Sequence, residues 1–276
     1  MVITYLGTGA AEGIPALFCN CEFCRYARKR HIVRARACVL LDGELCIDFS
    51  PDTFYREAVL GTDLSAVKYL LVTHSHMDHF YAHDFILRGY KYAEDMTSPT
   101  LDIFGNRDVL DVFSECTRRE LREEIKETIG LHELHAFEHV SFGEWHAYTL
   151  KARHSSREPL LYLLEKGDKR YLHLTDTGVL YDENYEFLQE VCKKPVDLIT
   201  FDCTFLLTPP SPNARHMNLR ENLQVLGKLK SLGLATERTK CVITHFSHNG
   251  KPTEETLRKA ESEGVIAAYD GMTLEF

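Results

Sequence analysis

The sequence predicts an α/β protein that folds as a four-layer αβ/βα sandwich. Two observations support this fold class: strand patterns ending in metal-type residues, followed by helical patterns, occur in both halves of the chain, and no linker or low-complexity segment separates the halves. Each half is then a sheet with helices on its outer face. A chain of 276 residues can bury a sizeable core and lies near the upper limit for one domain. We therefore expect one domain over residues 1–276.

The first half is rich in strand patterns. Its strands are expected over residues 2–6, 38–49 and 66–74. The second of these segments is a hairpin whose two-residue turn is Asp42-Gly43. A long helix is expected over residues 107–129, because apolar side chains recur there at helical spacing and Gly130 follows as a stop.

The second half repeats this order of strands and helices. Strands are expected over residues 145–154, 160–176, 196–205 and 240–246, and the second of these segments is a hairpin. Asn218 and Glu221 form the pattern of a capping box, which predicts a helix that ends at Gly233. Another helix is expected over residues 253–263, and residues 265–276 read as a closing hairpin.

The composition, 44% hydrophobic and 26% charged, is that of an ordinary soluble globular protein. The N-terminal residues lack the basic and apolar regions of a secretory signal, and no apolar run approaches the roughly 20 residues of a membrane helix. We therefore expect a cytoplasmic protein with no membrane partner. With no export signal, the nine cysteines favour thiols or metal ligands over a disulfide framework.

The formal net charge of −9 argues against a protein that coats nucleic acid, so we expect no extended nucleic-acid partner. A local exception is the stretch 25–36, which holds six Lys and Arg residues. It is interpreted as a solvated, partly helical surface. The alternative is a basic rim that attracts a small anionic substrate.

Residues 72–80 read VTHSHMDHF and follow a buried strand pattern. Such a concentration of histidine and aspartate suits neither an amphipathic surface nor an apolar core. Imidazole and carboxylate groups are ligands for divalent ions such as Zn²⁺, Mn²⁺ or Fe²⁺. His74 and His76 are spaced to chelate one ion, and Asp78 and His79 would turn toward a second. The stretch therefore predicts a metal site.

Two ions need further ligands, and three candidates stand at the ends of later strand patterns: His154, Asp176 and His245. This shared context places them at one edge of the sandwich. The other histidines are interpreted differently. One group is spaced for a helix face but follows Gly130 and has no nearby strand or acidic partner, namely His132, His135 and His139. These three are interpreted as surface residues, together with His31, His146 and His173.

The segment C-N-C-E-F-C brings Cys19, Cys21 and Cys24 within six residues. Thiols this close are poorly placed for disulfides but suit a tetrahedral Zn²⁺ that lacks one ligand. His248, three residues after His245, is a candidate for the fourth ligand. The remaining six cysteines are expected to be buried thiols in apolar strands.

The motif H-x-H-x-D-H, followed by His, Asp and His much later in the chain, resembles the metallo-β-lactamase superfamily. The resemblance covers essentially the whole chain and implies a four-layer metallo-β-lactamase sandwich with a dinuclear centre. It also implies the ligand sets: one ion would be held by His74, His76 and His154, the other by Asp78, His79 and His245, and Asp176 would bridge both. Many members place a glycine shortly after the motif, whereas this chain has Ala82 and His83, which leaves the substrate open.

The cysteine pattern and the segment GTGAAEGIPALFCNCEFCRYAR resemble the PhnP-type phosphodiesterases of carbon–phosphorus lyase pathways. That resemblance implies a structural Zn²⁺ bound by Cys19, Cys21, Cys24 and His248. In the resembled family, a histidine in a Pro-rich loop before a capped helix contacts the scissile phosphate. Here this residue is His216, as oxyanion stabiliser or general acid.

Together, these resemblances imply a dinuclear phosphodiesterase that uses two Mn²⁺ or Zn²⁺ ions and a metal-bridging hydroxide. Its substrates would be small anionic phosphodiesters, such as cyclic ribose phosphodiesters or 2′,3′-cyclic nucleotides. The catalytic residues would be His216 and Asp78, which orients the hydroxide as well as binding metal. Asp202, in F-D-C-T, is assigned no catalytic role. The resembled family also suggests a homodimer.

Three alternatives remain. A tRNA 3′-processing endonuclease would use the same metal ligands, but such enzymes carry an inserted basic arm of 30–50 residues, which is not evident in this sequence. A thioester or lactone hydrolase is not excluded by the metal site. A non-catalytic binder similar to PQQ-biosynthesis proteins would be favoured by the loss of active-site ligands, but the full set is present.

Overall fold

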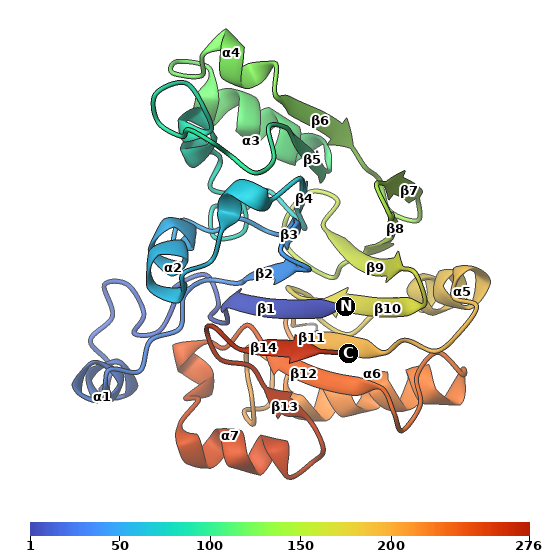
Figure 1. Cartoon of the computed structure of the whole chain (residues 1–276). Coiled ribbons are helices and arrows are strands. Elements are labelled where there is room, and N and C mark those ends of the chain that lie inside the picture. The colour runs from blue at the N-terminus through green and yellow to red at the C-terminus, as the bar shows by residue number, and fades with distance from the viewer. Residues whose placement is uncertain (213) are drawn as a thin grey trace.

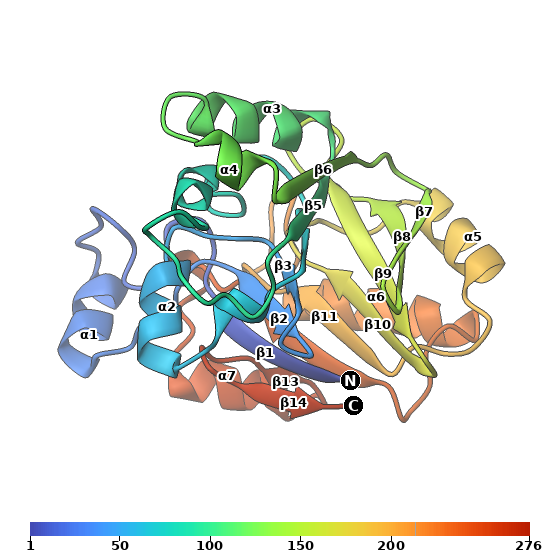
Figure 2. The same cartoon turned by 45° about the horizontal axis from the view of Figure 1, so that its top comes forward.

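The apolar runs of the sequence form two seven-stranded sheets that pack face to face, with helices on the outer face of each sheet (Figures 1 and 2). The computed structural model describes residues 1–212 and 214–276. This arrangement is the predicted four-layer αβ/βα sandwich, so the fold prediction is confirmed.

The first sheet has the strand order β14-β1-β2-β3-β4-β5-β6. Strands β3 to β6 pair in parallel, so their carboxyl ends meet at one edge. Asp42 and Gly43 lie in the hairpin turn as predicted and both have positive φ, but the connection has three residues, 42–44, because Leu41 pairs with Leu45. The strands are β1 (Val2–Gly7), β2 (Cys38–Leu41), β3 (Leu45–Ile47), β4 (Tyr69–Leu71), β5 (Leu101–Gly105), β6 (Ile129–Glu133) and β14 (Thr273–Glu275).

The second sheet has the strand order β13-β12-β11-β10-β9-β8-β7. Strands β10 to β13 pair in parallel, which brings the residues that follow β10, β11 and β12 to the same edge. The strands are β7 (His139–Phe142), β8 (Trp145–Lys151), β9 (Leu160–Lys166), β10 (Lys169–Leu174), β11 (Leu198–Asp202), β12 (Lys240–Thr244) and β13 (Ile266–Ala267).

The helices begin and end with recognisable signals. The predicted capping box is present: Asn218 Oδ1 accepts from Glu221 N at 3.0 Å, and the Glu221 carboxylate accepts from Asn218 N at 3.1 Å. The α-helices are α1 (Glu22–Arg30), α2 (Thr53–Leu60), α3 (Arg107–Thr117), α4 (Glu123–Lys126), α5 (Asp182–Val191), α6 (Leu219–Ser231) and α7 (Glu254–Glu261). Three 3₁₀ turns accompany them: η1 (Leu64–Ala66), η2 (Ala82–Leu87) and η3 (His248–Gly250).

The core consists of three apolar clusters that match the layers. The central cluster lies between the sheets and includes Tyr5 of β1 and Trp145 of β8, both fully buried. A second cluster packs the first sheet against α3, and a third packs the second sheet against α5, α6 and α7. Burial of this apolar surface is the main favourable term in folding, and it leaves the edge of the sandwich to polar residues.

The prediction of one long helix over residues 107–129 was wrong. Helix α3 ends at Thr117, whose hydroxyl bonds back to the carbonyl of Phe113 at 2.7 Å. A short α4 follows, and Ile129 then begins β6, which pairs in parallel with β5. Pairing with a sheet therefore outweighs the helical spacing of the apolar residues.

Two strand predictions need smaller corrections. The strand expected over 66–74 is confined to β4, because η1 precedes it and the metal-type turn begins directly after it. Residues 265–276 are not a hairpin: β13 pairs with β12 in the second sheet, whereas β14 pairs with β1 in the first. Gly271, at φ +89°, lies in the segment that crosses between the sheets.

Candidate metal centre

Seven side chains converge at the edge of the sandwich where the parallel strands end. We call this set the His/Asp centre: His74, His76, Asp78, His79, His154, Asp176 and His245. The turn after β4 is closed by backbone bonds from His79 N and Phe80 N to His76 O, at 3.0 and 2.8 Å. The other members follow β8, β10 and β12. The sequence-predicted ligands are thus brought together at one edge.

The first group of the centre consists of three histidines. His74 Nε2 and His76 Nδ1 lie 2.9 Å apart, and His154 Nε2 lies 3.2 Å from His76 Nδ1. Nitrogen atoms that bind one tetrahedral ion at about 2.0–2.1 Å are separated by roughly 3.3 Å. These three imidazoles therefore have the spacing of ligands to a single ion.

The second group combines two carboxylates with two histidines. His79 Nε2 lies 3.2 Å from Asp78 Oδ2 and 3.3 Å from Asp176 Oδ2, and His245 Nε2 lies 3.8 Å from the latter oxygen. Asp176 also lies 3.3 Å from His154 Nδ1, so its carboxylate stands between the two groups. This position suits a carboxylate that bridges two ions.

The donor atoms of the centre fit a metal. Three buried nitrogen atoms of the centre have no hydrogen-bond partner among the described residues: His79 Nε2, His154 Nδ1 and His245 Nε2. Buried polar atoms without partners are costly, and most are satisfied in native proteins. Imidazole and carboxylate donors facing one another at this spacing supply what a divalent ion binds.

Three residues at the same edge have a strained backbone conformation. Asp48, Asp176 and His245 all have positive φ, at 63°, 26° and 62°. The left-handed region is costly for residues with a Cβ, and it persists only where the surrounding structure fixes it. These three residues end strands and turn their side chains toward the centre.

Asp48 was not singled out in the sequence, yet it supports the centre from behind. Its Oδ2 accepts from His79 Nδ1 at 2.7 Å, and its Oδ1 accepts from Thr73 N at 2.8 Å. A carboxylate behind a metal-binding imidazole fixes its tautomer and orientation. The only sequence signal is an aspartate that directly follows the apolar strand β3.

His216 lies beside the centre and is held by two carboxylates. Its Nδ1 is 2.8 Å from Asp176 Oδ1 and 3.0 Å from Asp202 Oδ2. Burial lowers the pKa of His216, but the charges and hydrogen bonds of Asp202 and Asp176 outweigh it and raise the pKa to about 11. The side chain remains one-quarter exposed, so it is accessible from solvent.

Asp202, predicted to have no catalytic role, is fully buried and accepts several hydrogen bonds beside the centre. Besides binding His216, its Oδ1 accepts from the backbone amides of Thr204 and Met217 at 2.9 and 3.2 Å. These contacts give Asp202 a positioning role, because it holds the imidazole of His216. Its place at the end of β11 resembles that of the other strand-end residues, but its partner lies 14 residues further along the chain.

Burial and charge separate the pKa values of the histidines. Burial lowers the pKa of His154 to about 4, which keeps its imidazole neutral near pH 7. Burial acts in the same direction on His79, but Asp78 and Asp48 outweigh it and raise the pKa of His79 well above its usual value. Metal binding requires the neutral imidazole and therefore releases protons from such a site.

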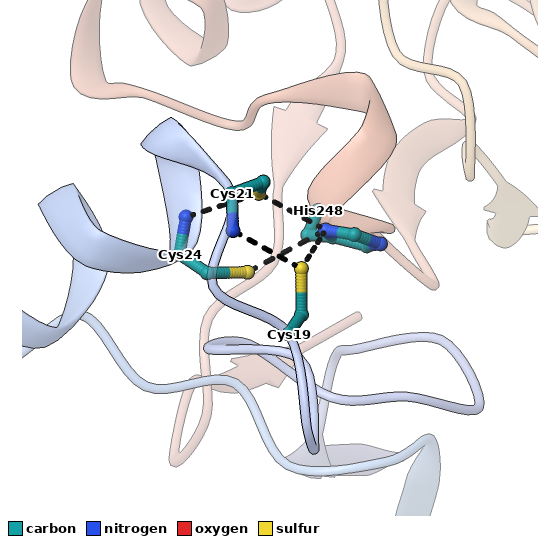
Figure 3. Close-up of side chains that lie close together, drawn as sticks. All are labelled: Cys19, Cys21, Cys24 and His248. Atoms are coloured by element: carbon teal, nitrogen blue, oxygen red, sulfur yellow. Dashed lines mark hydrogen bonds between the residues drawn. The ribbon is translucent and has the colours of Figure 1, made fainter.

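A second cluster, the cysteine knuckle, consists of Cys19, Cys21, Cys24 and His248 (Figure 3). The three sulfur atoms lie 3.4–3.6 Å from His248 Nδ1. Cys21 caps α1, with its Sγ 3.4 Å from Cys24 N. That backbone hydrogen bond is the largest of several effects that lower the pKa of the Cys21 thiol to about 6. Three thiols and one imidazole match a structural Zn²⁺ site.

Five of the six histidines interpreted as surface residues are exposed, which confirms that prediction for His31, His132, His135, His139 and His146. The expectation that the group after Gly130 has no nearby strand or acidic partner was wrong. His132 lies on β6 with Asp102 Oδ1 at 2.7 Å, and His135 lies 3.1 Å from Glu158 Oε1, so both have acidic partners. His139 lies on β7. His173 is buried between the sheets, because its position on β10 faces the central core.

The model of the family described as "Beta-lactamase superfamily domain" matches residues 45–246, which is most of the 276-residue chain. The chain belongs to the β-lactamase superfamily. Its complete set of His and Asp side chains makes it a metal-dependent hydrolase of this superfamily. The prediction drawn from the H-x-H-x-D-H motif is thereby confirmed.

Solved structures show the same fold. A diphosphatase from the PhnP family is 24% identical, with a TM-score of 0.74 over 100% of this chain and 96% of that one. Zinc-bound PqqB from Methylobacterium extorquens is 14% identical, with a TM-score of 0.69 over 100% of both chains. At these identities, the likeness establishes the superfamily fold and not the substrate.

An octanoyltransferase from Porphyromonas gingivalis is 35% identical over 78 residues. The match spans 27% of this chain and 15% of that enzyme. The shared segment is therefore a small part of the octanoyltransferase. Among the described residues, no helix combines the length and apolar character needed to cross a bilayer.

Proposed function

We propose that this hydrolase cleaves small phosphodiesters, with cyclic ribose phosphodiesters or 2′,3′-cyclic nucleotides as the substrate class. One observation carries the proposal: His216 stands beside the His/Asp centre, held through Nδ1 by Asp202 and Asp176. A cationic donor beside a metal centre suits a reaction that develops negative charge on phosphoryl oxygens. The PhnP-family diphosphatase supports the phosphorus chemistry through its shared fold.

The His/Asp centre would hold two Mn²⁺ or Zn²⁺ ions. His74, His76 and His154 would bind one, Asp78, His79 and His245 the other, and Asp176 both. Bound there, the ions would act as Lewis acids and lower the pKa of water toward neutrality. The buried carboxylate of Asp78 would orient the attacking water, because it lies within 3.2 Å of His79 Nε2 in the same cluster.

His216 would act on the phosphate through Nε2. Its Nδ1 is occupied by the two carboxylates, so Nε2 is the nitrogen available to donate. Asp202 keeps this tautomer and the cationic form, much as a buried carboxylate orients a catalytic imidazole elsewhere. The donor can stabilise a developing oxyanion or protonate the leaving oxygen.

The cysteine knuckle would hold one structural Zn²⁺. His248 lies three residues after His245, so the same segment belongs to both clusters. All nine cysteines are free thiols, which fits the reducing cytoplasm that we propose as the location. We also propose a homodimer. Exposed large apolar residues between positions 17 and 92 support it, including Leu17, Phe18, Phe54 and Tyr92.

Hydrolysis of an acyl ester or thioester is a second candidate, and the match to an octanoyltransferase favours it. A largely apolar cavity of about 580 Å³ lies between α2 and η2. Its wall includes Phe49, which directly follows Asp48, and Tyr81, two residues after His79. That volume is within the range of small-molecule sites.

The experiment compares both substrate classes on one preparation. Protein reconstituted with Mn²⁺ or Zn²⁺ is assayed with 2′,3′-cyclic AMP, bis(p-nitrophenyl) phosphate and p-nitrophenyl octanoate. We expect turnover of the phosphodiesters, and a fall in kcat of about 10²-fold or more for His216→Gln. Asp202→Asn should fall by a similar amount, and the double variant little further, because the two residues act as a unit. His31→Gln, at the exposed end of α1, is the control.

Turnover of the octanoate ester with neither phosphodiester cleaved would reverse the order of the two candidates. Full activity in both His216→Gln and Asp202→Asn would remove the observation on which the phosphodiesterase proposal depends.

A further inference from the structure

The β7–β8 hairpin brings three donor atoms together on its solvent face, outside the two clusters described above. His139 Nε2 lies 3.2 Å from His146 Nδ1. Ser141 Oγ lies 2.8 Å from His146 Nδ1 and 3.3 Å from His139 Nε2. All three residues are exposed. The atoms thus form a small triangle that is open to solvent.

The strand register creates this triangle. In the β7–β8 pair, Ser141 stands opposite His146, and His139 stands opposite Tyr148. Side chains alternate between the two faces of a strand, so His139, Ser141 and His146 share the outer face while Phe142 and Trp145 are buried. The convergence is therefore a property of the sheet.

The imidazole of His139 is also held in place by packing. It stacks on Tyr148 with ring centroids 4.5 Å apart and an angle of 14° between the planes. The two imidazoles lie nearly parallel, at 24° and 5.4 Å between centroids. Donors already arranged in this way lose little conformational freedom on binding a ligand.

We propose that His139, His146 and Ser141 form a third, solvent-exposed site for a borderline divalent cation such as Zn²⁺ or Cu²⁺. Donors that bind one ion at about 2.0–2.2 Å lie roughly 3 Å apart, as these three do. Two imidazoles select ions from the later first-row metals, and the open face leaves the remaining coordination positions to water.

The site is independent of the His/Asp centre. His146 lies five residues before the end of β8 at Lys151, which places it about 17 Å along the strand from that end. The nearby carboxylate of Glu165, opposite His146 on β9, is paired with Arg170 at 2.6 Å. The donors that the structure brings together here are two imidazoles and one hydroxyl, so the affinity of the site should be lower than that of the buried clusters.

The test is a calorimetric titration of Zn²⁺ into zinc-replete, dialysed protein, in which the buried clusters are already filled. We expect a further zinc equivalent in the wild type. It should be lost in His139→Ala and in His146→Ala, while Ser141→Ala weakens it only a few-fold. His132→Ala is the matched control, because His132 is also an exposed strand histidine and should leave this equivalent unchanged.

Thermal unfolding of each variant verifies that the hairpin remains folded. His139→Gln, which keeps a polar side chain on β7, serves in place of any variant that does not fold. The proposal is overturned if the wild type binds no further Zn²⁺. It is equally overturned if the equivalent survives both histidine substitutions, or disappears with His132→Ala.

Discussion

The cysteine knuckle takes three of its four side chains from six consecutive residues, whereas the His/Asp centre collects its members from residues 74 to 245. The knuckle is partly exposed at the start of α1, and the centre is mostly buried at the edge of the sandwich where the strands of both sheets end. Both clusters have donors suited to a metal, but the fold supports them differently. The fold positions the side chains of the His/Asp centre, whereas the cysteine knuckle would itself contribute to folding.

The two clusters differ in the hydrogen bonds that hold their side chains in place. The centre is supported from behind by buried carboxylates: Asp48 accepts from His79, and Asp202 lies 3.5 Å from His245 Nδ1. In the knuckle, the thiols contact mainly one another, nearby amides and His248. A zinc ion would therefore contribute most of the order of the knuckle, while the centre is arranged in advance.

The largest expected effect is on catalysis, from Asp176→Asn. This side chain faces His79, His154 and His216, so its loss should reduce kcat/KM by about 10³-fold or more. The folding of the metal-free protein should change little, since the fold already holds the centre. Kinetics with bis(p-nitrophenyl) phosphate and thermal unfolding measure the two quantities. Asp182→Asn, an exposed carboxylate on α5, is the control.

The opposite pattern is expected for Cys24→Ser. The variant should lose the knuckle zinc and unfold several degrees lower, because metal binding there contributes to folding. Its buried centre should still bind its ions. Metal analysis and calorimetric melting report both effects, with Cys116→Ser as a thiol control outside the knuckle. An unchanged melting temperature after zinc loss would contradict the claim that zinc at the knuckle contributes to folding.

Asp48→Asn tests the support behind His79. We expect metal affinity or activity to fall by about 10–100-fold, as for other carboxylates that orient a ligating histidine. The amide cannot accept both bonds that Asp48 now accepts from Thr73 and His79 without reversing one of them. Zinc competition assays measure this loss. Asp63→Asn, which caps η1, should bind metal as the wild type does.

The smallest expected effect is that of Glu12→Gln. Glu12 Oε1 accepts from Ser247 Oγ at 2.6 Å and from His248 N at 3.3 Å, and so steadies the knuckle histidine. Gln keeps one acceptor, so zinc affinity at the knuckle should fall by only about threefold to tenfold. A zinc-chelator competition measures it, and Glu22→Gln on α1 is the control. No change would mean that the thiols alone hold His248.

The sequence predicted the candidate metal sites best where several possible ligands lie within a few consecutive residues. The six-residue segments H-S-H-M-D-H and C-N-C-E-F-C have few other uses, and the ends of the predicted strands located the later His and Asp side chains of the centre. Asp48 and Asp202 were beyond reach, because each acts through a partner 31 or 14 residues away that only the fold identifies. His173 was misread for a related reason: on β10, one face meets the opposite sheet, and alternation alone does not say which residue faces it.

Four polar side chains cross the otherwise apolar centre of the sandwich. Tyr5 Oη lies 2.6 Å from Thr200 Oγ1, Tyr171 Oη lies 3.0 Å from the same hydroxyl, and His173 Nδ1 lies 2.7 Å from Tyr171 Oη. An apolar interface alone tolerates sliding, because dispersion contacts are not directional. This chain of hydrogen bonds admits a single alignment of β1 over β10 and β11. These hydrogen bonds therefore fix the position of one sheet relative to the other. The same alignment sets the distance between the His and Asp residues that each sheet contributes to the centre.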